Sequence, residues 1–257
     1  MTDKLSKERI LSHFANNDLH NLNIIYYDET DSTNTRAKLF AKDGGRAPAI
    51  FIADKQSAGR GRLGRAFESR GGVGLYITFL IDSRGSVPDT VRLTAETAVR
   101  ARRAIKRVSG IDPEVKWVND LYKNEKKLAG ILCEGVISPE GEILSVCIGI
   151  GINVYKRKFS DSLSGIATSI EDAGGIISSR AALCAALIEE MLSPADKDEL
   201  LSEYRERCML YNREVTVLSA GEPYSATVLG ITDDYQLMVK HRGETKLLSS
   251  GEVSLKL

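Results

Sequence analysis

The sequence predicts an α+β fold in which a mixed or antiparallel sheet carries helices and a small β-barrel follows. Three observations support this prediction. Apolar residues repeat with strand-like and helix-like spacing in turn over most of the chain. A Pro-Glu-Gly turn at 139–141 separates two apolar segments and therefore indicates an antiparallel hairpin. After residue 214, short alternating segments joined by turn residues are typical of a small barrel. We therefore expect one domain at 1–209 and a second at 210–257.

The individual elements are predicted from apolar spacing and from residues that begin or end helices. Ser32-Thr33-Asn34 supplies the N-cap of a helix through Phe40, and Gly44-Gly45 ends it. Pro88 begins a long amphipathic helix to Ser109, which Gly110 ends. Leu5 to Phe14 forms at most one amphipathic helix. Other helices are predicted at 178–191 and 195–209, sheet strands at 22–27, 49–53, 73–81, 129–136 and 143–150, and barrel strands at 215–217, 226–228, 236–239 and 244–248.

The overall composition indicates a cytoplasmic protein and argues against several classes of function. The chain of 257 residues has 35 basic and 35 acidic residues, whereas general nucleic-acid binding relies on an excess of basic ones. No apolar run is long enough for a signal region or a membrane span. The cysteines and histidines are widely separated, so we expect reduced thiols, no fixed metal cluster and no histidine-based catalytic triad.

The most informative segment, Gln56–Arg65, combines glycine with fixed positive charge, and we refer to it as the Gly-Arg loop. Gly59, Gly61 and Gly64 allow main-chain N–H groups to approach a ligand and favour left-handed conformations, so they predict an anion-binding nest. Guanidinium groups donate hydrogen bonds in a planar fork that orients carboxylate or phosphate oxygens. The loop carries three of them, on Arg60, Arg62 and Arg65.

Three other interpretations of this loop are weaker. Its spacing matches the G-x-G-x-x-G motif of dinucleotide-binding folds, with Asp82 at a suitable distance, but that motif requires a helix to begin within it. The chain instead continues into Ser-Arg-Gly-Gly-Val-Gly at 69–74, which disfavours a helix. The Arg-Gly repeats of disordered RNA-binding tails are longer and more basic. A plain solvated turn would carry its arginines only by chance.

A second polar cluster lies between residues 116 and 130, at the start of the predicted hairpin. Its lysines, its Asn-Asp pair and its single tryptophan are each more typical of a turn, a solvated surface or a core when taken alone. Together with the Gly-Arg loop they form a set suited to phosphate chemistry. Lysine and arginine neutralise charge that develops on a reacting α-phosphate, and an acidic residue helps to hold Mg²⁺.

These segments resemble the motifs of the biotin protein ligase family, in the same order. The resemblance extends from about residue 24 through Gly149-Ile150-Gly151-Ile152-Asn153 into the C-terminal β module. It implies a sheet related to class II aminoacyl-tRNA synthetases and an SH3-like barrel. It also implies that biotin and ATP form biotinyl-5′-AMP and that the biotinyl group passes to a lysine of a biotin carboxyl carrier domain. The matching motifs are Asp31-Ser32-Thr33-Asn34, the Gly-Arg loop, Lys116-Trp117-Val118-Asn119-Asp120 and Lys127-Leu128-Ala129-Gly130.

The resemblance further implies roles for individual residues. Ser32, Thr33 and Gln56 match positions that hydrogen-bond the polar head of biotin, with Asn34 beside them, and a buried ureido group needs such donors and acceptors. Lys127 matches the lysine at the carboxylate and the α-phosphate.

In the Gly-Arg loop, Gly59, Arg60, Gly61 and Arg62 match the segment that covers the carboxylate and the phosphate. We expect this loop to become ordered on binding. Lys127 and Arg62 are therefore the expected catalytic residues. The expected nucleotide or Mg²⁺ positions are Asn119, Asp120 and Asn153.

Some features depart from the family pattern or remain open. Phe67 and Arg70 stand where tryptophan and proline are common, and Val118 replaces a frequent proline, which leaves loop rigidity and nucleotide packing open.

We expect no DNA binding, because the residues before Ser32 are too few for the helix-turn-helix domain of repressor relatives. Lipoate ligation and a Gly-Arg RNA-binding module are the alternative functions. A homodimer is neither predicted nor excluded.

Overall fold

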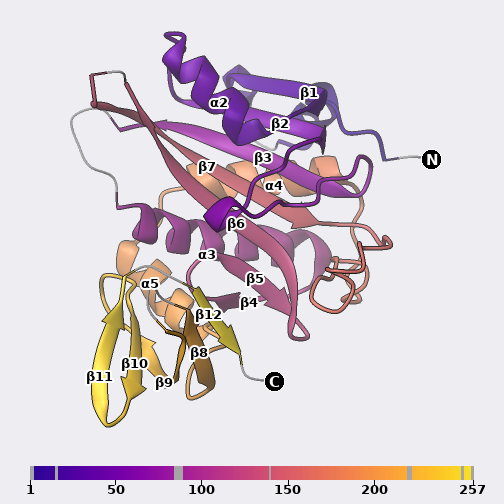
Figure 1. Cartoon of the computed structure of the whole chain (residues 1–257). Coiled ribbons are helices and arrows are strands. Elements are labelled where there is room, and N and C mark those ends of the chain that lie inside the picture. The colour runs from indigo at the N-terminus through magenta and orange to yellow at the C-terminus, as the bar shows by residue number, and fades with distance from the viewer. Residues whose placement is uncertain are drawn as a thin grey trace.

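The computed structural model describes residues 3–14, 17–83, 89–138, 140–218, 222–249 and 252–255. Its largest feature is a seven-stranded sheet with the order β1-β2-β3-β7-β6-β5-β4 (Figure 1). β1 and β2 are parallel, and the other neighbouring strands are antiparallel, so the predicted mixed sheet is confirmed. The strands are β1 (Ile24–Thr30), β2 (Ala49–Gln56), β3 (Gly74–Asp82), β4 (Glu114–Lys116), β5 (Asp120–Lys123), β6 (Lys126–Ile137) and β7 (Ile143–Asn153).

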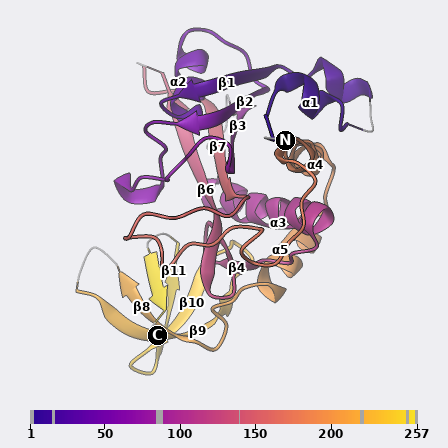
Figure 2. The ribbon, with the colours of Figure 1, turned by 90° about the vertical axis from the view of Figure 1, so that its right-hand side faces the viewer.

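Helices cover both faces of this sheet. α2 packs on one face, α1, α3 and α4 lie on the other, and α5 packs against α3 (Figure 2). In β2, Ile50 and Ile52 belong to the large apolar core, whereas Phe51 belongs to the smaller core under α2. Successive strand residues point to opposite faces, so an unbroken apolar run suits a sheet that is buried on both sides. The helices are α1 (Lys7–Leu11), α2 (Thr33–Lys42), α3 (Thr90–Ser109), α4 (Arg180–Leu192) and α5 (Lys197–Glu206).

The helix ends follow capping chemistry, with two differences from the prediction. α3 begins at Thr90, because Asp89 is its N-cap and accepts a hydrogen bond from the N–H of Arg92 at 3.0 Å. The predicted start, Pro88, lies outside the described residues. Gly110 ends α3 in the left-handed conformation, as predicted. Ser32 occupies the N-cap position of α2, but its side chain makes no capping hydrogen bond.

The predicted hairpin of β6 and β7 is confirmed and extends further than predicted, with paired residues from Ala129↔Ile152 to Ile137↔Ile143. In its turn, Gly141 is left-handed, while Pro139 lies outside the described residues. The prediction missed β4 and β5. These strands have three and four residues, which are too few to show a clear alternation.

The C-terminal segment forms a separate antiparallel sheet of five strands with the order β11-β10-β9-β8-β12. Four of its strands were predicted, and β12 was not. Closure into an SH3-like barrel and the division at residue 209 remain predictions. The strands are β8 (Glu214–Leu218), β9 (Tyr224–Ile231), β10 (Leu237–His241), β11 (Glu244–Leu248) and β12 (Glu252–Leu255).

One continuous apolar core connects the two sheets. Across this boundary, Trp117 donates a hydrogen bond from Nε1 to the carbonyl of Tyr235 at 2.8 Å. Tyr204 is fully buried, stands edge-on to the Tyr235 ring at 5.4 Å and donates a hydrogen bond to the carbonyl of Val118 at 3.2 Å. The C-terminal sheet and α5 therefore fix the segment that leads into β5.

The four cysteines are free thiols, as predicted. Burial raises the pKa of Cys133 to about 11 and that of Cys147 to about 12, so both remain protonated near neutral pH. Within the described ranges, none of the helices combines the length and the apolar character that crossing a bilayer requires.

Replacing Tyr204 with Phe is expected to lower the free energy of unfolding by about 1–2 kcal/mol, because the buried carbonyl of Val118 loses this donor. Urea denaturation measures the difference. Tyr211→Phe is the matched control, since Tyr211 is 59% exposed and its loss of a hydroxyl is expected to change stability by less than about 0.5 kcal/mol. Equal stability of the two variants would show that the buried hydrogen bond contributes nothing.

Candidate active site

Two adjoining pockets lie where the start of α2, the Gly-Arg loop and strands β5 to β7 meet. The inner pocket spans about 450 Å³ and the outer pocket about 1110 Å³, and both volumes include space that is open to solvent. The two pockets adjoin each other, because five residues line both. Their common lining consists of Gly61, Arg62, Phe67, Asn119 and Lys127.

In the inner pocket, Thr33 and Gln56 hold each other in a fixed orientation. The Oε1 atom of Gln56 accepts hydrogen bonds from the N–H of Thr33 at 2.8 Å and from its hydroxyl at 3.1 Å. The Nε2 atom of Gln56 donates to the hydroxyl of Ser69 at 2.8 Å. This assigns the two ends of the carboxamide and leaves one Nε2 hydrogen for a ligand.

Asn34 is held from both ends as well. Its Oδ1 atom lies 2.6 Å from the hydroxyl of Thr78, and its Nδ2 atom donates to Glu134 at 2.9 Å. An added Cβ atom at Gly149 would lie 2.1 Å from this Oδ1 atom, so glycine is required at that position of β7. Asn34 therefore forms a rigid wall of the inner pocket.

Glu134, on β6, is a central charged group that sequence analysis missed. Its carboxylate accepts hydrogen bonds from Asn34, from Lys38 at 2.7 Å and from Arg60 at 3.0 Å. Burial alone would raise the pKa of Glu134, but the hydrogen bonds from Asn34 and Lys38 and the charges of Lys38 and Arg60 outweigh this effect and leave the pKa lowered. The side chain is therefore ionised at neutral pH.

The Gly-Arg loop folds into a short hairpin with a turn of 3-10 helix at Arg62–Gly64, and the nest prediction is wrong in part. Gly64 is left-handed (φ 74°), as is Leu63 (φ 54°), but Gly59 and Gly61 are not. The N–H of Gly61 donates to the carbonyl of Arg65 at 2.7 Å. This N–H therefore points into the loop rather than toward a ligand. Gly59 is required for another reason, because an added Cβ would lie 2.3 Å from the carbonyl oxygen of Phe67.

The arginines connect this loop to the sheet. Arg60 forms its ion pair with Glu134 of β6, and Arg62 donates to Oδ1 of Asn119 at 3.0 Å. Arg65 lines the outer pocket. The three arginines of the loop therefore line the two pockets, and their predicted contacts with a carboxylate and a phosphate remain predictions.

Lys127 and Asp120 form an ion pair of 2.7 Å at the junction of the two pockets. The Lys127 side chain is 33% exposed and that of Asp120 is 18% exposed, so an incoming anion can reach the ammonium group. Asn119 donates from Nδ2 to Asp120 at 3.0 Å and to the carbonyl of Ile131 at 3.1 Å. These contacts fix Asp120, and Asp120 in turn orients Lys127.

The outer pocket is more aromatic and contains a buried arginine. Asn153 lines it and accepts a hydrogen bond from Arg157 at 3.1 Å. The guanidinium of Arg157 lies 4.4 Å from the centre of the Phe159 ring and pairs with Glu68 at 3.4 Å. Trp117 also lines this pocket. An aromatic wall with cations beside it suits a flat base attached to a phosphate.

The structure brings most of the predicted residues together. Ser32 and Gly59 line neither pocket, although Ser32 is buried next to Thr33. The inner pocket contains Thr33, Asn34, Gln56, Arg60, Gly61, Arg62, Asn119 and Lys127, and the outer pocket adds Asp120 and Asn153.

Several site residues were not predicted, because they lie in apolar or charged segments without a local motif. Thr78 is a threonine in the apolar strand β3, and its sequence context does not indicate a site residue. Its hydroxyl is notable only because the structure shows it fully buried, where a polar group needs a hydrogen-bond partner. Glu134, Arg157 and Phe159 carry no signal in the local sequence.

The three departures from the family pattern are accommodated by local contacts. Phe67 lines both pockets and stands edge-on to Tyr76 at 6.3 Å. Arg70 pairs with Glu68 at 2.6 Å and leaves its carbonyl to accept a hydrogen bond from Tyr76. Val118 is buried beneath Tyr204. No charged group of the site is lost.

The chain resembles known proteins in sequence. Residues 26–153 match the biotin/lipoate A/B protein ligase family. A bifunctional ligase/repressor BirA of Bacillus subtilis is 38% identical over 154 residues, which are 59% of this chain and 47% of that protein. The chain thus spans about half the length of this relative. A biotin--[acetyl-CoA-carboxylase] ligase of Mycobacterium tuberculosis is 28% identical over 238 residues, 88% of this chain and 86% of that protein.

The fold comparison agrees. The solved structure of biotin protein ligase from Aquifex aeolicus in complex with biotin and ATP superposes with a TM-score of 0.76 at 27% identity. The superposition covers 91% of this chain and 98% of that one. It therefore includes both sheets rather than the motif region alone. Residues 26–153, which include every residue that lines the inner pocket, therefore belong to the biotin/lipoate A/B protein ligase family.

Proposed function

We propose that this protein is an ATP-dependent biotin ligase that forms biotinyl-5′-AMP and transfers the biotinyl group to a lysine of a biotin carboxyl carrier domain. The observation that carries the proposal is the position of Lys127 and Arg62 at the junction of a small polar pocket and a larger aromatic one. The biotin ligases among the relatives and the solved structure with biotin and ATP support it.

The inner pocket suits the ureido head of biotin, which has one carbonyl acceptor and two N–H donors. Gln56 has one Nε2 hydrogen left, and the Oδ1 atom of Asn34 has a second lone pair. Because these groups are already held by Thr33, Ser69 and Thr78, they lose little entropy when they bind a ligand. The dithiolane ring of lipoate offers neither a strong donor nor a strong acceptor and would leave them unpaired.

At the junction, the carboxylate of biotin would meet the α-phosphate of ATP. The carboxylate oxygen attacks phosphorus, the bond to the leaving oxygen breaks, and pyrophosphate departs. Lys127 and Arg62 hold the two anions together and stabilise the negative charge on the α-phosphate oxygens as the new bond forms. In the second step, the uncharged amine of the carrier lysine attacks the acyl carbon, the bond to AMP breaks and AMP leaves, and the nitrogen passes one proton to water.

Mg²⁺ fits this site as a companion of the nucleotide rather than as a resident ion. Protein Mg²⁺ sites commonly use one or two carboxylates together with substrate phosphates and water. The outer pocket has two such side chains, Glu68 and Asp120. When bound, the ion would neutralise phosphate charge, and Asp120 is the carboxylate nearer to Lys127.

We also propose a cytoplasmic location and a catalytic domain at 1–209 followed by an SH3-like domain at 210–257. Four free thiols favour a reducing compartment, where ATP and carrier domains are also available.

Incubation of the protein with ATP, Mg²⁺, an apo carrier domain and either biotin or lipoate is expected to add the mass of one biotinyl group and no lipoyl group. Mass spectrometry of the carrier measures both. A site built to hydrogen-bond its substrate rejects an analogue without those groups by about 10⁴-fold. Lipoyl addition would assign the other activity of the family, and no modification with salt-sensitive RNA binding would favour the RNA-binding alternative.

Replacing Lys127 with Met is expected to slow pyrophosphate release about 10²- to 10³-fold, because the positive charge at the reacting phosphate is lost. Lys126→Met is the matched control, since Lys126 is the exposed neighbour in the same turn, and its rate is expected to equal that of the wild type. A stopped assay for pyrophosphate measures both. Wild-type rates in the Lys127 variant would contradict the assigned role.

Replacing Arg62 with Gln is expected to shorten the lifetime of bound biotinyl-5′-AMP roughly 10- to 100-fold, the range for loss of a charge-assisted hydrogen bond. The lifetime is measured by trapping released adenylate after gel filtration. Arg46→Gln, at an exposed turn before β2, is the control. An unchanged lifetime would show that Arg62 does not retain the intermediate.

A further inference from the structure

Arg180, the first residue of α4, joins both ends of the chain segment that contains the Gly-Arg loop. Its side chain is 1% exposed. Its Nη1 atom donates to Asp54 at 2.6 Å and to the carbonyl of Gly74 at 3.1 Å. Asp54 lies in β2, two residues before Gln56, and Gly74 begins β3 after the loop returns. One guanidinium nitrogen therefore connects the outgoing and the returning strand.

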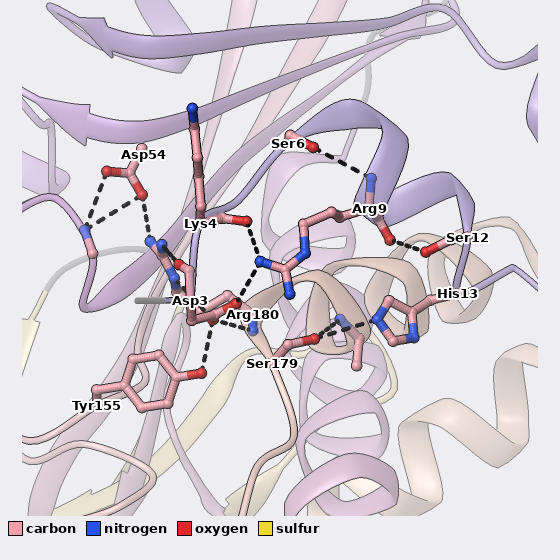
Figure 3. Close-up of polar contacts among 12 residues, drawn as sticks. Asp3, Lys4, Ser6, Arg9, Ser12, His13, Asp54, Tyr155, Ser179 and Arg180 are labelled. Carbon is pink, nitrogen blue, oxygen red and sulfur yellow. Dashed lines mark hydrogen bonds and ion pairs between the residues drawn. The ribbon is translucent and has the colours of Figure 1, made fainter. Parts of the chain in front are cut away.

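The same guanidinium holds the segment that precedes α1 (Figure 3). Its Nε atom donates to the carboxylate of Asp3 at 3.3 Å and its Nη2 atom to the carbonyl of Asp3. The N–H of Arg180 donates to the same carboxylate at 2.7 Å, and so does the hydroxyl of Tyr155. Tyr155 follows Asn153 of the outer pocket by two residues. Asp3 thus contacts segments that lead to both pockets.

Hydrogen bonds continue from this cluster to the inner pocket. Both carboxylate oxygens of Asp54 accept from the N–H of Gly72, at 3.2 and 3.3 Å. Three residues earlier, the hydroxyl of Ser69 accepts from Nε2 of Gln56, and the N–H of Gln56 donates to the carbonyl of Ser69 at 3.0 Å. A shift of Asp54 would therefore be transmitted to the carboxamide that faces the ligand.

The energetics favour a role beyond stability. Burying a guanidinium costs several kcal/mol, and well-packed apolar side chains of the same volume are often as stable as a buried ion pair. Stability at this place could therefore come from apolar packing, and the adjacent Leu5 is indeed fully buried. Apolar side chains form no directional hydrogen bonds. They could not hold β2, β3 and the segment before α1 in a fixed geometry, as the guanidinium does.

We propose that Asp3 and Arg180 are positioning residues which, through Asp54, hold the base of the Gly-Arg loop in the geometry that retains the acyl adenylate. The part of this proposal that concerns the adenylate rests on the proposed function. The part that concerns the geometry of the loop does not. Neither residue touches the reacting atoms.

The test uses Asp3→Ala and Asp54→Asn in the full chain. Variants of Arg180 itself would leave two carboxylates unpaired and are expected to unfold. Lys4→Ala is the control, because the Lys4 side chain is exposed and points away from the cluster (Figure 3).

Trypsin provides a readout without any ligand, since Arg60, Arg62 and Arg65 make the Gly-Arg loop a substrate. The bonds cut first are identified by mass spectrometry.

Cleavage at these three bonds is expected to rise about 3- to 10-fold in both variants, within the range for coupling through packed networks. The lifetime of bound biotinyl-5′-AMP is expected to fall by a similar factor. Lys4→Ala is expected to match the wild type in both measurements. Cleavage elsewhere reports global unfolding and is expected to change less than cleavage in the loop.

A purely structural role would lower the melting temperature of the variants but leave loop cleavage and adenylate lifetime at control values, and this result would overturn the proposal. If no protein, including the wild type, formed the adenylate, the proposed function would fail. The comparison of loop cleavage would then still decide whether Asp3 and Arg180 position the loop.

Discussion

The carboxylate of Glu134 connects three parts of the chain on which the active site depends. It lies on β6 and accepts hydrogen bonds from two residues of α2, Asn34 and Lys38, and from Arg60 of the Gly-Arg loop. A partly buried carboxylate is costly unless such donors surround it. The protein's own contacts therefore hold the start of α2, the middle of the sheet and the loop in one arrangement, and preorganisation of this kind lowers the entropy lost on binding.

Space for the site comes from residues that lack a side chain. A Cβ atom at Gly151 would lie 2.6 Å from the Phe67 ring, and one at Gly149 would overlap Asn34. Both glycines lie in β7, in the centre of a sheet that is otherwise filled by apolar side chains. Close packing of that kind leaves few voids, so an internal pocket requires small residues at defined positions. The alternation of glycine and isoleucine in 149–152 thus builds a core on one face and a ligand wall on the other.

The parts of this site that sequence analysis predicted are those encoded in contiguous motifs. Gln56, Arg62 and Lys127 stand in segments whose composition indicates their chemistry, and the structure places them together. Glu134 and Arg180 could not be predicted in this way, because their partners lie 74 to 177 residues away. The nest prediction was wrong for Gly59 and Gly61 for a different reason. The glycine content indicates which backbone conformations the loop can adopt. It does not indicate that an N–H group of the loop would donate to a carbonyl within the loop, as that of Gly61 does.

The cations that would face the substrate in the proposed reaction have partners within the protein. Lys127 pairs with Asp120, Arg60 with Glu134, and Arg62 donates to Asn119. The binding free energy of an incoming anion is therefore only the difference between the contacts that it makes and the contacts that it replaces. A neutral ligand would break these contacts and offer no charge in return, so the site favours anionic ligands. In the proposed reaction, the carboxylate and the α-phosphate bring two like charges together at the junction. The exchange of partners would offset their repulsion and so favour the approach that leads to the adenylate.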